Sequence, residues 1–184
     1  MTATMNLLGL SGSLRQQSAH TAILRTVAER LPEHVQLTLH ELNNVPPYNE
    51  DDDGAHPPQA VIALRAAVAA ADGLVIGSPE YNHGMSGVLK NALDWASRPG
   101  FNSPLKNKPV LIMTSSPGVL GGVRAQSQLR ETLSATLSRV ICSPQIVIPG
   151  VNQKIQNGSF SDETTIQFMI VAVNELIREI KLLE

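Results

Sequence analysis

The sequence of 184 residues contains a single cysteine, Cys142. An intramolecular disulfide is therefore impossible, and a zinc site built from several cysteines is excluded. Aromatic residues make up only 3% of the chain, so the core must be built from aliphatic side chains. Single-stranded nucleic acids bind by stacking on aromatic rings, of which this chain offers few. The acidic run 51–53 lacks the spacing and distal glutamate of a calcium loop, which favours a solvated loop over a metal site.

A strong net charge is absent as well. The chain has 14 basic and 16 acidic residues, which gives a formal charge of -2. No strong electrostatic field and no dense basic patch is therefore available to attract nucleic acid or an anionic membrane. The apolar run 5–10 is too short to span a bilayer, and the first basic residue is Arg15, so the start lacks the charged region of a signal peptide. We expect a cytoplasmic protein with no membrane insertion and no nucleic-acid partner.

Short apolar strands alternate with amphipathic helices along the chain. Strands are indicated by short apolar or alternating runs bounded by glycine, proline and polar residues. Helices are indicated by apolar residues at helical spacing. The predicted strands lie within 5–10, 35–42, 73–77, 109–113 and 140–148. The predicted helices span 18–31, 58–71, 86–97, 122–137 and 162–180.

This order repeats a strand–helix unit five times. Apolar strands alternating with amphipathic helices predict an α/β fold with a parallel sheet covered on both faces. Five strands suit the 2-1-3-4-5 order of the flavodoxin-like three-layer sandwich better than the six-stranded dinucleotide-binding fold. The length suits one domain, which we expect to span residues 1–184.

Three polar loops follow the predicted strands. They cover residues 11–18, 78–85 and 114–122. In a flavodoxin-like sheet, ligands bind beyond the carboxyl ends of the strands, where the strand order reverses. We therefore expect the three loops to form one binding site.

The first loop, residues 11–18, has the composition of a phosphate site. It offers serine hydroxyls, Arg15 and the flexible Gly12, and it leads into a helix N-terminus with unpaired N–H groups. The alternative is a plain strand-to-helix turn with Ser18 as the helix N-cap. The loop lacks G-x-G-x-x-G and G-x-x-x-x-G-K-[ST], so dinucleotide and triphosphate motifs are unsupported. Residues 9–13 also miss the last glycine of the G-x-S-x-G nucleophile elbow.

The other two loops offer a place for a flat polar ring. In loop 78–85, Asn82 carries both a donor and an acceptor, and backbone N–H groups can face a polar ring edge. The alternative is that Tyr81 and Asn82 only shape a turn. His83 could act as an acid or base, but a lone loop histidine is more often a solvated residue. Loop 114–122 is rich in glycine and hydroxyls, which would let a ring approach the backbone; the alternative is an ordinary loop.

Four motifs together resemble one known family. The chain is similar to the NAD(P)H-dependent FMN reductase family, and within it to the bacterial quinone and chromate reductase branch. The resemblance runs in order from about residue 6 to residue 150, and it is specific for the family but not for the electron acceptor. The motifs are Gly12-Ser13-Leu14-Arg15-Gln16-Gln17-Ser18, Pro79-Glu80-Tyr81-Asn82, Gly87-Val88-Leu89-Lys90-Asn91-Ala92-Leu93-Asp94-Trp95, and Thr114-Ser115-Ser116 with Gly121-Gly122.

The resemblance implies a flavin site and an assembly. It implies non-covalently bound FMN, with NADPH or NADH as co-substrate, and a homodimer or homotetramer. The residues that it places around the phosphate are Ser11, Ser13, Arg15, Gln17 and Ser18. Those that it places along the isoalloxazine are Pro79, Glu80, Tyr81, Asn82, Ser115 and Ser116.

The leading interpretation is an oxidoreductase that passes electrons from a nicotinamide through FMN to a small acceptor, such as a quinone, chromate or free flavin. No catalytic acid or base is assigned, because the flavin itself carries the chemistry. The alternative is a flavodoxin-like electron carrier without its own NAD(P)H turnover. A third interpretation is a non-redox FMN or phosphate-binding module. A serine hydrolase is disfavoured by the failed nucleophile elbow.

Overall fold

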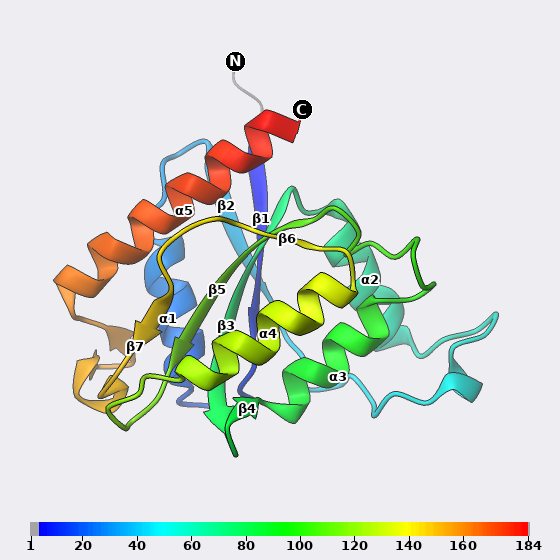
Figure 1. Cartoon of the computed structure of the whole chain (residues 1–184), viewed down its shortest axis with the longest axis horizontal. Coiled ribbons are helices and arrows are strands. Elements are labelled where there is room, and N and C mark those ends of the chain that lie inside the picture. The colour runs from blue at the N-terminus through cyan, green and yellow to red at the C-terminus, as the bar shows by residue number, and fades with distance from the viewer. Residues whose placement is uncertain (1–3, 184) are drawn as a thin grey trace.

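A computed structural model describes residues 4–183. The chain alternates strands and helices, as Figure 1 shows from the N-terminus in blue to the C-terminus in red. The main strands are β1 (Met5–Ser11), β2 (Val35–His40), β3 (Gly73–Tyr81) and β5 (Pro109–Ser115), and the short strands are β4 (Gly84–Met85), β6 (Arg139–Val140), β7 (Ile146–Ile148), β8 (Ile155–Gln156) and β9 (Ser159–Phe160). The helices are α1 (Ala19–Ala28), α2 (Gln59–Ala70), α3 (Gly87–Ala96), α4 (Val123–Ala135) and α5 (Glu163–Leu183), with 3-10 turns η1 (Glu50–Asp52) and η2 (Val151–Lys154).

The main sheet is parallel and has the order β2-β1-β3-β5-β6, with β7 also pairing with β5. The short β4 pairs only with β3 and stands outside this order. When the other strands are numbered along the chain without β4, the order is the expected 2-1-3-4-5, so the prediction of a flavodoxin-like fold is confirmed. The fifth position differs in detail, since β6 pairs with the start of β5 and β7 with its end. Between them lies Pro144, which has no N–H group to donate to a sheet ladder.

The third strand is longer than expected. Residues 78–81, predicted as part of a loop, continue β3, because the strand pairs with β5 as far as Pro79 opposite Ser115. Beyond that point β3 turns back on itself through β4, with Glu80 opposite Met85. This part of the prediction was wrong, since polar residues such as Ser78 and Glu80 gave no apolar strand pattern.

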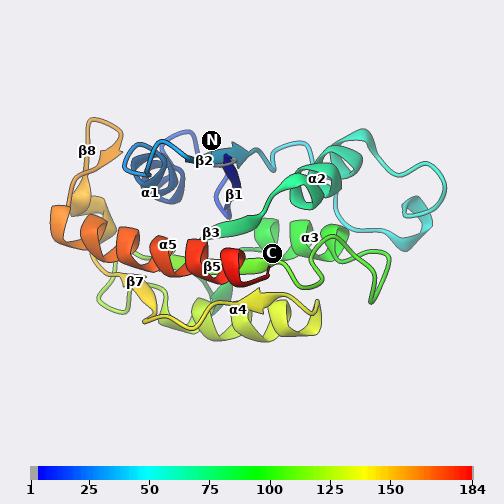
Figure 2. The ribbon, with the colours of Figure 1, turned by 90° about the horizontal axis from the view of Figure 1, so that it is seen from above.

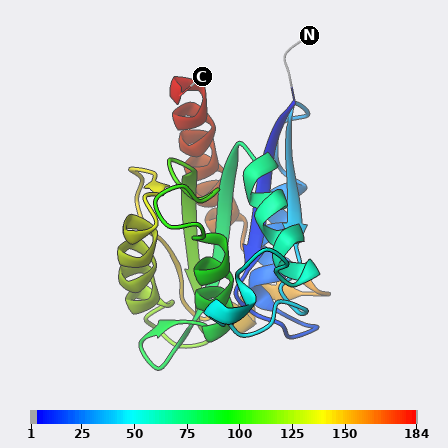
Figure 3. The same ribbon diagram turned by 90° about the vertical axis from the view of Figure 1, so that its right-hand side faces the viewer.

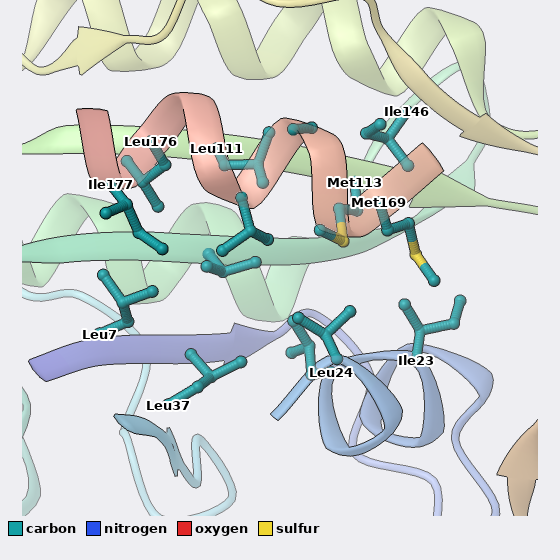
Figure 4. Packing of buried hydrophobic residues seen from close by; sticks show 14 of the residues in the cluster. Leu7, Ile23, Leu24, Leu37, Leu111, Met113, Ile146, Met169, Leu176 and Ile177 are labelled. Carbon is teal, nitrogen blue, oxygen red and sulfur yellow. The ribbon is translucent and has the colours of Figure 1, made fainter. Parts of the chain in front are cut away.

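Two apolar clusters cover the two faces of the sheet. The first joins the sheet to α1 and α5, and the second joins it to α2, α3 and α4. Figure 3 looks onto the face of the sheet that α2, α3 and α4 cover, with α5 behind the strands. In the first cluster, shown in Figure 4, Leu24 and Met169 are fully buried, and burying a side chain of this size stabilises the fold by about 1.5–3 kcal/mol. Both clusters are almost entirely aliphatic, as the scarcity of aromatic residues required.

Helix ends follow their capping residues. The Ser18 hydroxyl accepts a hydrogen bond from the Thr21 N–H at the start of α1, and the Ser86 hydroxyl accepts one from the Leu89 N–H at the start of α3. Ser18 is therefore the N-cap, as predicted. The α1, α3 and α4 N-termini and the carboxyl ends of β1, β3 and β5 lie at one edge of the sheet, at the bottom of Figure 1. No helix within residues 4–183 combines the length and apolar character needed to cross a membrane.

Candidate functional site

Gly12 brings the first two loops into contact. Its N–H donates to the Gly77 carbonyl over 2.7 Å, so the first loop leaves β1 directly beside β3. A Cβ atom at this position would lie 2.8 Å from Ser86 Oγ and 3.2 Å from Pro79 Cδ. Glycine is therefore required here by the close approach of the loops that follow β1 and β3.

The first loop leaves a row of hydrogen-bond donors unused. Within residues 4–183, the backbone N–H groups of residues 13–17 form no hydrogen bond, and Arg15 is exposed and forms no ion pair. These donors directly precede the positive end of α1. A phosphate group is the ligand that such a loop suits best. The loop therefore fits the FMN phosphate that the resemblance implies.

The serine hydroxyls of this loop have unequal roles. Ser11 Oγ accepts from Thr21 Oγ1 over 3.0 Å and lies 3.5 Å from the Ser13 carbonyl oxygen. Ser18 is buried and uses its oxygen as the helix cap. Ser13 and Gln17 make no side-chain hydrogen bond in the described part of the chain and stay available to a ligand. Ser11 and Ser18 therefore also shape the loop that would hold the anion.

A buried histidine links the first and third loops, and the sequence analysis did not identify it. His20 lies in the first turn of α1 and is 5% exposed, and its Nε2 lies 2.8 Å from Ser115 Oγ. Burial lowers the pKa of His20 from 6.5 to about 4, although hydrogen bonding to Ser115 and Ser78 opposes this shift. The imidazole is therefore neutral at pH 7. Only the tertiary fold reveals that His20 is buried, because the residues next to it in the sequence give no sign of its burial.

The second loop is a tight hairpin. Tyr81 pairs with Gly84, and the two residues between them, Asn82 and His83, have φ angles of 50° and 68°. Positive φ at both central residues is the geometry of a type I′ turn, in which asparagine is favoured. Tyr81 is 53% exposed at this turn. Asn82 therefore shapes a turn, and the hairpin tip is open to a ligand.

Glu80 clamps the hairpin to α4. Its Oε2 accepts hydrogen bonds from the Arg124 N–H over 2.9 Å and the Ala125 N–H over 3.3 Å. The N-cap residue of α4 is Gly122, which has no side chain to cap the helix. The Glu80 carboxylate, only 12% exposed, takes that role and places negative charge at the positive end of the helix. The Glu80 side chain is thus already engaged by α4 and is not available to a ring.

The third loop ends in two glycines with left-handed backbone conformations. Gly121 and Gly122 have φ angles of 57° and 87°, and a Cβ on Gly122 would lie 2.9 Å from Thr114 Cβ. Ser115 is fully buried, with its hydroxyl toward His20. Ser116 donates its N–H to Ile148 and its hydroxyl to Gly118. Hence the Ser115 hydroxyl is engaged in the interior of the fold, whereas Ser116 is partly exposed.

Comparison with known proteins identifies the family of this chain and the cofactor of that family. The family of NADPH-dependent FMN reductases matches residues 5–153. The chain belongs to this family. The NADPH-dependent FMN reductases carry FMN and use NAD(P)H, so this chain is an FMN-dependent oxidoreductase, and the interpretation from the four motifs is confirmed.

Individual relatives of this FMN reductase support the same family assignment. An NAD(P)H-dependent FMN reductase of Pseudomonas aeruginosa is 40% identical over 148 residues, 80% of each chain. A quinone reductase of Escherichia coli K12 is 35% identical over 191 aligned residues, covering 99% of this chain and all of that one. Among solved structures, the flavoenzyme NAD(P)H:(acceptor) oxidoreductase FerB of Paracoccus denitrificans superimposes with a TM-score of 0.86 at 28% identity, covering 97% of this chain and 98% of that one.

Proposed function

We propose that this FMN reductase holds its cofactor by the phosphate on the first loop. The observation that carries the proposal is the row of unused N–H groups at residues 13–17, next to Arg15 and the α1 N-terminus. The residues proposed around the phosphate are Ser11, Ser13, Arg15, Gln17 and Ser18. The residues proposed along the isoalloxazine are Pro79, Glu80, Tyr81, Asn82, Ser115 and Ser116, with Glu80 and Ser115 contributing through their backbone.

The protein positions the reactants and the cofactor supplies the redox chemistry. Bound FMN allows two electrons to pass from NAD(P)H to an acceptor. The N–H groups of Asn82 and His83 form no hydrogen bond within residues 4–183, so they can donate to a polar ring edge. The buried His20 is neutral and hydrogen-bonded to Ser115, which makes it a support of the loop. No side-chain acid or base is therefore assigned to catalysis.

The acceptor that we propose is a quinone. The relatives supply the support: besides the quinone reductase of E. coli, a 2-hydroxy-1,4-benzoquinone reductase of Burkholderia sp. is 35% identical over 159 residues, 86% of each chain. The exposed hairpin tip at Tyr81 leaves the proposed ring site open to a small flat molecule. Chromate and free flavin are the competing acceptors.

One set of assays tests this function. The purified protein should show the visible absorption of bound flavin and oxidise NAD(P)H with benzoquinone faster than with free FMN or chromate. If bound flavin were present but reduced only by a separate reductase, the protein would be a flavodoxin-like carrier. If no acceptor supported NAD(P)H oxidation, the chain would be a non-redox flavin-binding module.

We also infer a homodimer or homotetramer. A groove between α3 and α4, of about 410 Å³, has a mostly polar lining but includes Phe101, which is 82% exposed, and Leu137. Exposed aromatic side chains of this kind are typical of protein interfaces. Light scattering coupled to size exclusion tests the assembly, and a monomer would contradict it. A cytoplasmic location stays a prediction of the sequence.

A further inference from the structure

A polar cleft adjoins the first loop on its α1 side. It has a volume of about 360 Å³. One wall is the face of α1 that carries Arg25, and the opposite wall is the hairpin of β8 and β9. Its residues are Gln16, Gln17, Ser18, Thr21, Ala22, Arg25, Ile155, Asn157 and Gly158. The cleft therefore begins at the same residues that end the proposed FMN phosphate loop.

The hairpin wall is a preformed structure. Asn157 and Gly158 form its two-residue turn with φ angles of 50° and 82°, and Asn-Gly is the sequence that type I′ turns favour most. The hairpin is held on α1 because the Phe160 N–H donates to Thr26 Oγ1 over 3.2 Å, and the Phe160 side chain is buried. Figure 2 shows β8 beside α1. The cleft is thus fixed between two anchored elements.

The charge of the cleft is uncompensated. Arg25 is its sole ionised side chain, and within residues 4–183 no carboxylate pairs with Arg25. The two acidic residues at the start of α5 are engaged elsewhere, Asp162 with Lys154 and Glu163 with Arg30. The other polar groups of the cleft are amides and hydroxyls, which suit the sugar and base of a nucleotide. This lining suits an anionic ligand that also has polar, uncharged parts.

We propose that this cleft binds the adenosine 2′-phosphate end of NADPH, with Arg25 on the phosphate, and so sets a preference for NADPH over NADH. The inference rests on the proposed function, because the nicotinamide end must reach FMN bound at the neighbouring loop. NADPH and NADH differ only in this 2′-phosphate, and an arginine fork recognises phosphate by paired charge-assisted hydrogen bonds. The volume of the cleft accommodates a nucleoside phosphate.

Steady-state kinetics with benzoquinone tests the preference. The ratio of kcat/KM for NADPH to that for NADH should exceed one in the FMN-loaded parent and fall about 10- to 100-fold in Arg25→Gln. Arg25→Lys should recover part of the ratio, since it restores the charge without the fork. Asn157→Asp keeps a favoured turn residue but adds negative charge to the opposite wall, so it should lower the ratio several-fold. The matched control is Arg178→Gln, an exposed arginine on α5, which should leave the ratio unchanged.

Calorimetry supplies a readout that does not depend on turnover. Titrated into the FMN-loaded protein, 2′,5′-ADP should bind at least about tenfold more tightly than 5′-ADP, and Arg25→Gln should abolish the difference. An unchanged ratio in Arg25→Gln or Asn157→Asp, or equal binding of the two nucleotides by the parent, overturns the cleft assignment. If the parent turns over NAD(P)H but binds both nucleotides equally, only this inference fails. If 2′,5′-ADP binds through Arg25 but NAD(P)H is not oxidised, the proposed function is wrong and the assignment of the cleft as a 2′-phosphate site is retained.

Discussion

The buried imidazole of His20 should make the protein less stable as the pH falls below 6.5. The pKa of His20 is about 4 in the folded protein, against 6.5 for an ordinary histidine. Between these values the unfolded chain binds a proton that the folded chain does not, so acid favours unfolding. This group alone should cost about 2 kcal/mol of unfolding free energy between pH 7.5 and pH 5, and about 3 kcal/mol once the pH is below 4. Urea denaturation at pH 7.5, 6 and 5 measures the loss.

A matched variant separates His20 from the other titrating groups. His20→Gln replaces the imidazole with an amide, which can hydrogen-bond to Ser115 but cannot titrate. The stability of the variant should therefore fall less with acid than that of the parent. The difference in unfolding free energy between the two proteins should change by about 2 kcal/mol in favour of the variant between pH 7.5 and pH 5. His34→Gln, at an exposed position, should follow the parent. Parallel pH profiles for the parent and His20→Gln would refute the reasoning.

Three further substitutions test the edge where the loops meet. Glu80→Ala should lower the unfolding free energy by about 1–2 kcal/mol, because it removes the cap of α4; an unchanged urea midpoint would contradict that role. Gly12→Ala should cost about 1–3 kcal/mol and weaken FMN binding, because the new methyl group would press on Ser86 Oγ; unaltered stability and FMN affinity would show that the loops can separate freely. Arg15→Ala should weaken FMN binding by about tenfold or more, measured by flavin fluorescence, while stability without FMN stays close to that of the parent; FMN retention equal to the parent would move the phosphate site elsewhere.

The architecture was largely predictable because its determinants are local. Short apolar runs placed the main strands, and apolar residues at helical spacing placed the five helices, since each pattern reflects which face of one element is buried. The N-cap at Ser18 was predictable for the same reason, because capping involves residues three apart in the chain. The order of the sheet followed from the handedness and short connections of strand–helix units. The first loop was predicted as a phosphate site from its own composition.

The tertiary structure decided which polar side chains are free. Glu80 was expected beside the flavin, but its carboxylate caps a helix that begins more than 40 residues later. Ser115 was expected to face the ring, but its hydroxyl bonds to His20, 95 positions earlier in the chain. The cleft at Arg25 likewise exists only because the hairpin around Asn157 folds back onto α1. Periodicity thus determined the elements, composition suggested a phosphate at the first loop, and the motifs carried the resemblance that named FMN. Burial and hydrogen-bond partners depend on residues distant in sequence and became definite only in the folded chain.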